Sequence, residues 1–306
     1  MATPGSPALR RRRLAAELRR LRGGRPGHEV ARGLGWSTSK VSRYELGRST
    51  LPLDEVEKML DFYGVSDPER GQLLSLAREA NQRGWWEDYA DALPEEYQTF
   101  IGLEAEAASA AIWAVDIIPG LLQTEDYARQ VHLGYQAVVP IPPGIIDTRV
   151  KVRMIRQQLL VRDPPLELSV VLDESVLYRP IGNPRMMYAQ LRHLLQIADL
   201  PNVELRVLSL SKERLAVNSF TILGFNPIGE SGGLRDVVNT ETTVSSDFYV
   251  EGESETYFHR LVFQSLLNVS CSSSKSKDLI QQTAERLWPN QLHVRHRPYS
   301  AILAQG

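Results

Sequence analysis

The chain has 306 residues, which is long enough for two domains that each bury a hydrophobic core. Hydrophobic residues make up 42% of the sequence, charged residues make up 24%, and the mean hydropathy is −0.25. These values exclude a mainly disordered chain, a collagen-like repeat and a membrane protein. The single cysteine, Cys271, excludes an internal disulfide and a cysteine-rich metal site. No apolar run follows the N-terminal arginines as in a signal peptide, so we expect a cytoplasmic protein, and we expect no cofactor.

The formal net charge of −2 conceals a strong asymmetry. Residues 1–50 contain 12 Lys and Arg against three acidic residues, a net of +9, which leaves a net of −11 for residues 51–306. A basic head on an acidic body is typical of a protein that contacts nucleic acid at one end. The alternative is a charged, solvated N-terminal tail, and charge alone does not distinguish the two.

A bundle of five short helices is predicted in the N-terminal region. Gly35 permits the left-handed turn of a tight corner between the second and third helices, and Ser37 is a suitable N-cap for the third. Two short helices joined in this way are the layout of a helix-turn-helix. The spacing of apolar residues predicts the five helices over residues 8–22, 28–34, 38–46, 52–63 and 68–79.

The corner sequence is more specific than the layout. Residues 30–47 read VARGLGWSTSKVSRYELG, and over residues 9–64 the chain resembles the Xre (Cro/repressor-type) helix-turn-helix family. Pro26 departs from the family pattern, in which Thr or Ser usually caps the second helix, although proline is tolerated in a first helical turn. The resemblance implies that the third helix reads double-stranded DNA.

The first turn of a recognition helix enters the major groove, where Arg and Lys suit guanine and hydroxyl groups suit several base edges. We therefore expect base reading by Thr38, Ser39, Lys40 and Arg43. Other basic side chains and the N–H groups at the start of the second helix suit phosphates, which set the register. The expected phosphate contacts are Arg10, Arg11, Arg12, Arg13, Gly27, His28, Arg32 and Arg48. The alternative for both sets is a solvated charged surface.

The region after the bundle changes in character. Trp85-Trp86 stand in a polar segment, where we expect them to anchor a linker against a core, with an exposed binding patch as the alternative. Strand-like segments then appear among helices. Helices are predicted near residues 95–114, 143–161, 185–198, 255–267 and 277–287, with another that Thr124 caps, and strands near 166–172, 203–208, 220–225 and 234–238.

The predicted fold class is therefore multi-domain, α and α/β: an all-α, five-helix Xre-type helix-turn-helix domain followed by a mixed α/β domain. The last residues show no periodicity, so we expect a poorly ordered tail. The predicted divisions are a flexible N-terminus at 1–8, the helix-turn-helix domain at 9–80, a Trp-rich linker at 81–95, an α/β regulatory or partner-binding domain at 96–288, and the tail at 289–306.

A second resemblance covers roughly residues 9–285. The phrase IPGLLQTEDYAR at 118–129 is followed in order by Arg153-x-x-Arg156-Gln157 and Leu172-Asp173-Glu174. This order resembles the C-terminal domain of unknown function attached to Xre-type regulators of actinomycetes, which are called WhiJ-like or antitoxin-like regulators. Many of these regulators sit beside a short companion protein, so the resemblance implies a small protein partner that is encoded nearby.

Three features resemble catalytic or metal sites, and each has a plainer explanation. Gly229–Gly233 matches G-x-S-x-G but lacks the strand before it and the helix after it, so a hairpin loop is expected. Asp173-Glu174 suits a helix N-cap better than an acid–base pair, because adjacent carboxylates point in different directions. His293 and His296 stand in the tail without further ligands. We therefore expect neither an enzyme nor a metal site.

A basic stripe is predicted on the helix near 143–161, because Arg149, Arg153 and Arg156 follow i, i+4, i+7 spacing. With Gln157 beside it, this stripe is a candidate site for an anionic ligand or for the acidic residues of a partner. The alternative is ion pairing within the domain, which is common. The candidate partners for such pairs are Glu104, Glu106 and Asp173.

The sequence thus predicts a sequence-specific DNA-binding transcriptional regulator whose C-terminal domain senses a ligand or binds a small companion protein. We expect a homodimer, because one recognition helix reads too few base pairs for useful specificity, and we expect no membrane contact. The alternative is an antitoxin-like interaction module that mainly binds a short partner protein, with DNA binding secondary.

Overall fold

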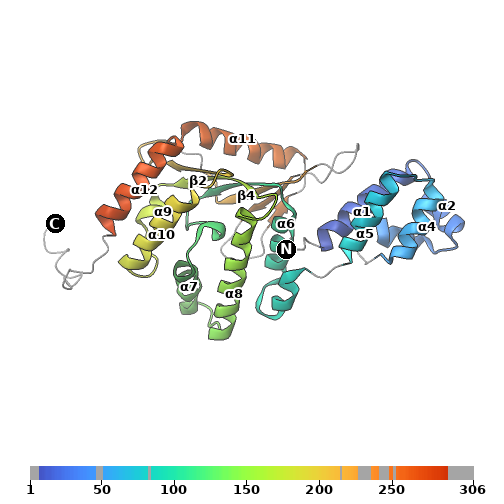
Figure 1. Cartoon of the computed structure of the whole chain (residues 1–306), viewed down its shortest axis with the longest axis horizontal. Coiled ribbons are helices and arrows are strands. Elements are labelled where there is room, and N and C mark those ends of the chain that lie inside the picture. The colour runs from blue at the N-terminus through green and yellow to red at the C-terminus, as the bar shows by residue number, and fades with distance from the viewer. Residues whose placement is uncertain are drawn as a thin grey trace.

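The structure is a computed structural model with two parts, a helical N-terminal domain and an α/β domain (Figure 1). This confirms the predicted fold class. The structure describes residues 7–45, 51–81, 84–213, 216–226, 236–240, 248–250 and 253–288.

Five helices form the described part of the N-terminal domain, each within two residues of its predicted limits. Their apolar faces meet in a core that includes Leu14, Leu18, Val56 and Leu60, all of which are fully buried. The helices are α1 (Pro7–Arg22), α2 (Gly27–Leu34), α3 (Thr38–Glu45), α4 (Leu53–Tyr63) and α5 (Glu69–Ala80).

The corner between α2 and α3 has the predicted geometry. Gly35 has a φ of 68°, in the left-handed region that a residue with a Cβ adopts only with strain. The Ser37 hydroxyl accepts a hydrogen bond from the Lys40 amide at 3.3 Å, so it caps α3 as expected. Pro26 precedes α2 without a side-chain cap bond among the described residues, in keeping with its departure from the family pattern.

The linker is anchored as predicted. A 3-10 helix, η1 (Trp85–Ala92), connects the two domains, and Trp86 is only 5% exposed. Its ring packs in a cluster with Ile101 and Val152 from two helices of the α/β domain. Trp86 therefore attaches the linker to that domain.

The described residues of the α/β domain form a six-stranded mixed sheet with the order β3-β2-β1-β4-β5-β6. β1 pairs in parallel with β2, and β2 pairs in parallel with β3, while the pairs β1–β4, β4–β5 and β5–β6 are antiparallel. The strands are β1 (Ser109–Ala114), β2 (Glu167–Asp173), β3 (Val203–Leu208), β4 (Phe220–Gly224), β5 (Val237–Thr240) and β6 (Phe248–Val250).

Helices cover the two faces of this sheet unequally. One face packs against a layer of helices that lies below the sheet in Figure 1, and α11 crosses the opposite face. Three short 3-10 helices, η2 (Gly120–Leu122), η3 (Tyr135–Ala137) and η4 (Gln157–Leu160), join elements of the larger layer. The α-helices are α6 (Glu95–Glu106), α7 (Glu125–Gly134), α8 (Pro143–Arg156), α9 (Ser175–Tyr178), α10 (Pro184–Ile197), α11 (Glu253–Val269) and α12 (Ser273–Leu287).

One predicted element is wrong. The helix expected over 95–114 ends at Glu106, and its second half is the central strand β1. β1 is hydrogen-bonded on one side to β2 and on the other to β4, so sheet pairing on both edges outweighs the helix propensity of its alanines. The other predicted strands and helices are confirmed where the structure describes them, and β6 was not predicted. The G-x-S-x-G segment, the tail histidines and Arg48 lie outside the described residues.

Candidate nucleic-acid interface and ligand cavity

The helix α3, which is predicted to read DNA, presents a polar face. Thr38, Ser39, Ser42 and Arg43 are exposed, while Val41 packs against α2 in the cluster with Val30 and Ala31. This division follows from the helical period, which places the apolar side chains toward the bundle and the others toward solvent. Three of the four predicted base-reading residues therefore lie on an accessible surface, and Ser42 joins them.

Lys40 is placed differently from the other three. Its ammonium lies 2.7 Å from a Glu55 carboxylate oxygen and 4.4 Å from the centre of the Trp36 ring. Glu55 also accepts a hydrogen bond from the Tyr44 hydroxyl. Burial raises the pKa of Glu55, but the bonds from Lys40 and Tyr44 outweigh it and leave that pKa below its ordinary value. Lys40 thus joins α3 to α4 in this conformation.

A hollow of about 310 Å³ opens between α1, α2 and α3. It brings together Gly27 and Thr38, two residues predicted at the DNA, with Arg19 and Arg22 from the last turn of α1. Arg19 and Arg22 are not among the predicted DNA contacts, although basic residues in the last turn of the first helix are a signal that the sequence contains. Arg22 donates from Nε to Glu45 of α3 at 2.8 Å, so the exposed Arg19 is the cationic side chain beside the first turn of α2 that suits a phosphate.

The remaining predicted phosphate contacts divide into two groups, apart from Arg12, whose side chain lies outside what the structure describes. Arg32 and His28 are exposed on α2, and Arg11 is partly exposed on α1. Arg10 and Arg13 are placed differently, because both form ion pairs with Glu106 of α6, at 2.8 Å and 3.7 Å. These two arginines connect the two domains and are not presented to solvent as phosphate contacts.

The basic stripe of α8 is confirmed as a stripe, but its members have different surroundings. Arg156 is buried and donates two hydrogen bonds of 2.7 Å to the carboxylate of Glu104, and a third of 2.5 Å to the Tyr97 hydroxyl. Burial alone would lower the pKa of Arg156, but Glu104 and Tyr97 together raise it above its ordinary value. For Arg156, therefore, the structure shows ion pairing within the domain, which was the alternative to a ligand or partner site.

Arg149 and Gln157 also bond to the backbone of the domain. Arg149 donates from Nε to the carbonyl of Ala92 at 2.9 Å, at the end of the linker helix η1. The Gln157 amide donates to the carbonyls of Gly120 and Gln123. Both side chains fix loops and neither lines the cavity described next.

Arg153 lies at the wall of a cavity of about 270 Å³ between the sheet and the helices α6, α7 and α8. Its Nη1 donates to the side-chain oxygen of Gln123 at 2.7 Å. Three buried polar atoms in the lining have no hydrogen-bond partner among the described residues: Nε of Arg153, Nε2 of His132 and Oδ1 of Asn239. Such atoms are uncommon in folded proteins, because leaving a buried polar group unpaired is costly.

His132 is uncharged in this setting. Burial first, and then the nearby charges of Arg153 and Arg149, lower the pKa of His132 from 6.5 to about 3. At neutral pH the cavity wall therefore carries the charge of Arg153 beside a neutral imidazole.

Comparison with known families identifies the family to which this α/β domain belongs. Residues 97–282, well over half of the chain, match the family described as Domain of unknown function (DUF5753). The chain belongs to this family. Residues 13–73 match a family described as Helix-turn-helix domain, which covers the bundle from α1 to α5. A search of curated proteins finds no match to the chain.

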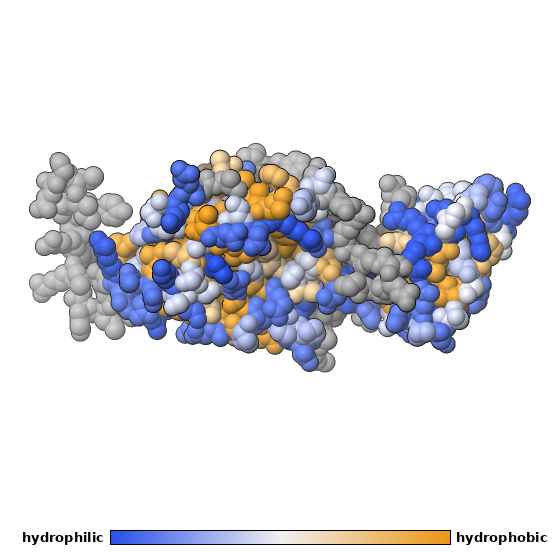
Figure 2. Space-filling model, turned by 90° about the horizontal axis from the view of Figure 1, so that it is seen from above, coloured by the Kyte–Doolittle hydropathy of each residue, from blue (hydrophilic) through white to orange (hydrophobic). Residues whose placement is uncertain are grey.

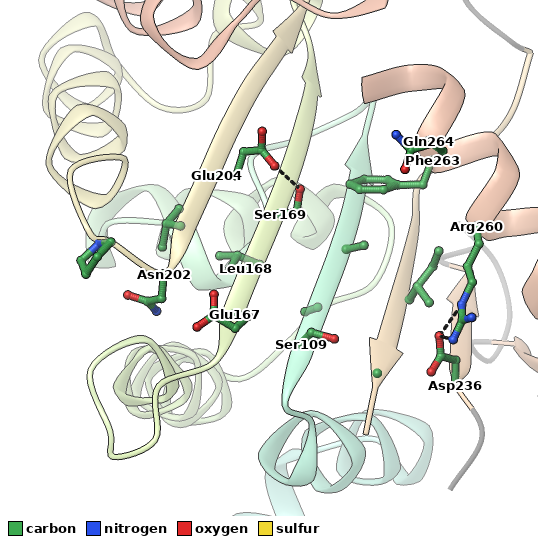
Figure 3. A pocket seen from close by; sticks show the side chains of 16 residues that line it. Ser109, Glu167, Leu168, Ser169, Asn202, Glu204, Asp236, Arg260, Phe263 and Gln264 are labelled. Carbon is green, nitrogen blue, oxygen red and sulfur yellow. Dashed lines mark hydrogen bonds and ion pairs between the residues drawn. The ribbon is translucent and has the colours of Figure 1, made fainter. Parts of the chain in front are cut away.

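The sheet face that α11 crosses is partly uncovered in the DUF5753 domain. A hollow of about 480 Å³ lies over β1, β2 and β3, where Ser109 and Ser169 expose the sheet beside α11 (Figure 3). Glu204 accepts from Ser169 at 3.4 Å on one side, and Arg260 of α11 pairs with Asp236 on the other. Small and polar side chains thus replace the apolar ones that cover the rest of this face.

The outer side of α11 is also apolar. Tyr257, Phe258 and Leu261 are each more than half exposed. Figure 2, which looks down on this side of the molecule, shows hydrophobic residues over the DUF5753 domain among hydrophilic ones. Exposed apolar groups beside a hollow are typical of surfaces that bind other proteins.

Asp173 and Glu174 have structural contacts in the DUF5753 domain. An Asp173 oxygen accepts from the amide of Ser175 at 3.0 Å, at the start of α9. Glu174 accepts from the Tyr178 hydroxyl at 2.6 Å and from the amide of Leu210 at 2.8 Å, and these bonds hold the pKa of Glu174 below its ordinary value although burial raises it. Both side chains thus have structural roles, but the predicted capping differs in detail: Glu174 is the N-cap residue of α9 and makes no side-chain capping bond to the described residues, and Asp173 before it bonds to the first amide of the helix. In the described part of the chain, no helix is both long and apolar enough to cross a membrane.

Proposed function

We propose that this protein is a sequence-specific transcriptional regulator of the Xre type, which reads double-stranded DNA with α3 and is controlled through its DUF5753 domain. The observation that carries the proposal is the corner of α2, Gly35 and α3, which leaves Thr38, Ser39 and Arg43 exposed on one face of α3. A helix that presents such side chains in its first turn and one turn further along the same face fits the major groove.

Charge supports the same surface for DNA. The exposed Arg19 and Arg32 lie on the helices that flank α3, while residues 51–306 carry a net charge of −11. Phosphates are attracted to the basic head and repelled by the acidic body. DNA contact is therefore confined to the N-terminal domain, and the DUF5753 domain is left for other partners.

The protein acts in this proposal as a homodimer in the cytoplasm, without catalysis. Two recognition helices related by a two-fold axis read half-sites about one helical turn apart, which doubles the number of base pairs that are recognised. The order of a helix-turn-helix domain and a DUF5753 domain supports membership of the WhiJ-like, antitoxin-like regulators that the sequence resembles.

Selection from a pool of random double-stranded DNA tests the proposal. The purified full chain is expected to enrich one sequence with two related half-sites at a fixed salt concentration. Arg43→Ala should lose the preference at one or two positions of each half-site, and Arg129→Ala, at a partly exposed arginine on α7, is the matched control. Failure of the unaltered chain to enrich any sequence contradicts the proposal.

A second candidate function is the binding of a short companion protein, with DNA binding secondary. The observation in its favour is the exposed apolar side of α11, with Phe258 and Leu261, beside the open part of the sheet. Phe258→Asp should abolish copurification with a short protein encoded nearby and leave DNA selection unchanged. Equal copurification of both forms contradicts this second function.

A further inference from the structure

The cavity behind Arg153 is built from elements that are far apart in the sequence. Thr221 of β4 and Asn239 of β5 are register partners on one face of the sheet and form its floor. Both are buried, and they stand on a face whose neighbouring positions are apolar. Two polar side chains side by side on the core face of a sheet are unusual, since that face normally carries only apolar groups.

The unpaired polar atoms of the cavity could be satisfied by hydrogen-bonding groups of a ligand. Asn239 is 2% exposed, and its Oδ1 accepts no hydrogen bond from the described residues. Nε of Arg153 and Nε2 of His132 are likewise buried without a partner in the described part of the chain. These atoms come from a strand and two helices, so a single small molecule placed between them would meet all three.

The buried charges of the lining favour an anion, because Asp116, the acidic residue of the lining besides Glu104, is exposed to solvent. Arg156 is neutralised by two hydrogen bonds to Glu104, so this pair adds no net charge to the wall. Arg153 is bonded to the neutral amide of Gln123, and no carboxylate among the described residues pairs with it. A guanidinium that is partly buried without a counter-ion is a ready partner for a carboxylate.

The remaining walls favour a flat apolar body. Tyr97 and Phe100 of α6 stack with ring centres 6.5 Å apart and an angle of 20° between their planes. Ile112 and Val131 complete an apolar lining. A ring placed there would bury its faces against aromatic and branched side chains.

We propose that this cavity is an effector site for a small carboxylic acid with a ring and an O–H or N–H donor. The carboxylate would bind Arg153, the ring would lie against α6, and the donor would bond to Oδ1 of Asn239. The inference rests on the proposed function, in which the DUF5753 domain senses a ligand.

The position of α6 gives such a ligand a route to the DNA-binding domain. Glu104 of α6 lines the cavity, and Glu106, two residues further along the same helix, pairs with Arg10 and Arg13 of α1. A ligand that shifts α6 therefore acts on the helix that holds the bundle, and occupancy is expected to change operator affinity by about 5-fold or more.

Calorimetric titration of the full chain with 4-hydroxybenzoate tests the site. This probe supplies a carboxylate, a ring and one O–H donor, and it is small enough for a cavity of about 270 Å³. We expect saturable one-to-one binding, at least 10-fold weaker binding of the uncharged 4-hydroxybenzamide, and no binding of inorganic phosphate. Equal binding of the amide, or no binding of 4-hydroxybenzoate, overturns the proposal.

Variants locate the binding. Arg153→Gln should weaken the affinity for 4-hydroxybenzoate by about 10- to 100-fold, because a charge-assisted hydrogen bond is lost. Arg153→Lys keeps the charge and should recover part of the loss. Asn239→Leu should remove the preference for 4-hydroxybenzoate over benzoate, which lacks the donor. Arg149→Gln, on the same helix but outside the cavity lining, should bind as the unaltered chain does.

Each variant is accepted only if its melting curve remains cooperative, and Arg153→Lys preserves the test if Arg153→Gln fails to fold. Unchanged affinity in a folded Arg153 variant overturns the site.

The same protein samples are assayed for DNA selection without ligand. Normal selection without carboxylate binding overturns this inference and leaves the proposed function intact. Carboxylate binding without any DNA selection contradicts the proposed DNA reading. Binding that leaves operator affinity unchanged overturns the effector role.

Discussion

The Nε atom of Arg10 in α1 lies 2.8 Å from Oε1 of Glu106 in α6. The other oxygen of Glu106 lies 3.7 Å from Arg13, whose guanidinium also stands over the ring of Phe225. The two arginine side chains are 14% and 11% exposed, so they are largely withdrawn from solvent. The basic head thus uses part of its charge to hold the α/β domain, and less than its net +9 is available to DNA.

The first prediction concerns the salt dependence of operator binding. Each phosphate contact contributes about 0.9 to the slope of log affinity against log salt concentration. Arg32→Ala, on the exposed side of α2, should reduce this slope by about 0.9. The double variant Arg10→Ala, Arg13→Ala should leave it unchanged, because these side chains pair with Glu106. Filter binding between 50 and 200 mM salt, roughly the range over which such slopes are measured, gives the answer.

A fall of about two in the slope of the double variant would mean that Arg10 and Arg13 leave Glu106 when DNA binds. Glu106→Gln is the informative companion variant. It removes the carboxylate that holds both arginines, so the slope should increase toward the value expected with two further phosphate contacts.

The second prediction separates Arg43 from Lys40. Arg43→Ala should weaken operator binding by about 1–3 kcal/mol and relax the sequence preference, as expected for loss of a base contact. Lys40→Ala should instead lower the free energy of unfolding of the chain by about 1 kcal/mol, because it removes the Glu55 ion pair and the contact with Trp36. DNA selection and urea unfolding of the two variants distinguish these effects.

The opposite pattern, in which Lys40→Ala alters base preference while stability is unchanged, would restore Lys40 to the base-reading set. Lys58→Ala is a control for the loss of a surface lysine. Lys58 pairs with Asp54 on the exposed face of α4 at 3.2 Å. In this variant neither the free energy of operator binding nor the free energy of unfolding should change by more than a few tenths of a kcal/mol.

The elements that could be predicted from sequence are those whose pattern is local. The five helices of the head follow from apolar spacing and from Gly35 and Ser37, which act within one turn. β1 could not be predicted in this way, since residues 107–114 read AASAAIWA and continue the apolar spacing of α6. Its strand conformation depends on pairing with β2 and β4, which begin 58 and 111 residues after its first residue.

The candidate sites show the same limit. The spacing correctly placed Arg153 and Arg156 on one face of α8, but it could not reveal that Glu104 neutralises one of them and that a cavity lies beside the other. Thr221 and Asn239 carry no motif. Their signal was a polar residue at an inward position of each apolar strand, which becomes visible only when the strand register is known.

The third prediction concerns the buried pair of Arg156 and Glu104. Arg156→Met should lower the free energy of unfolding by about 3–5 kcal/mol, because it leaves Glu104 buried without its partner. Glu104→Leu combined with Arg156→Met should recover much of this loss, since two apolar residues replace the pair. Urea unfolding of the two single variants and the double variant gives the coupling. Additive losses would contradict a mutually dependent buried pair.

The fourth prediction concerns pH. Burial and the charges of Arg153 and Arg149 lower the pKa of His132 to about 3, whereas its ordinary value is 6.5. Between these two values the unfolded chain binds a proton at His132 and the folded chain does not, so stability falls as the pH is lowered from about 6.5 toward 3. Above pH 6.5 His132 is neutral in both states and contributes no slope.

His132→Gln should therefore reduce the slope of the free energy of unfolding against pH in this window, by at most about 1.4 kcal/mol per pH unit, which is the contribution of one proton. The measurement is urea unfolding at several pH values from 4 to 7.5 in roughly half-unit steps, with the same ionic strength throughout. His28→Gln, on the exposed surface of α2, is the matched control and should leave the slope unchanged. If the two variants have the same slope as the unaltered chain, His132 binds its proton over the same pH range in the folded and the unfolded chain, and the cavity wall carries a second cation beside Arg153 below about pH 6.5.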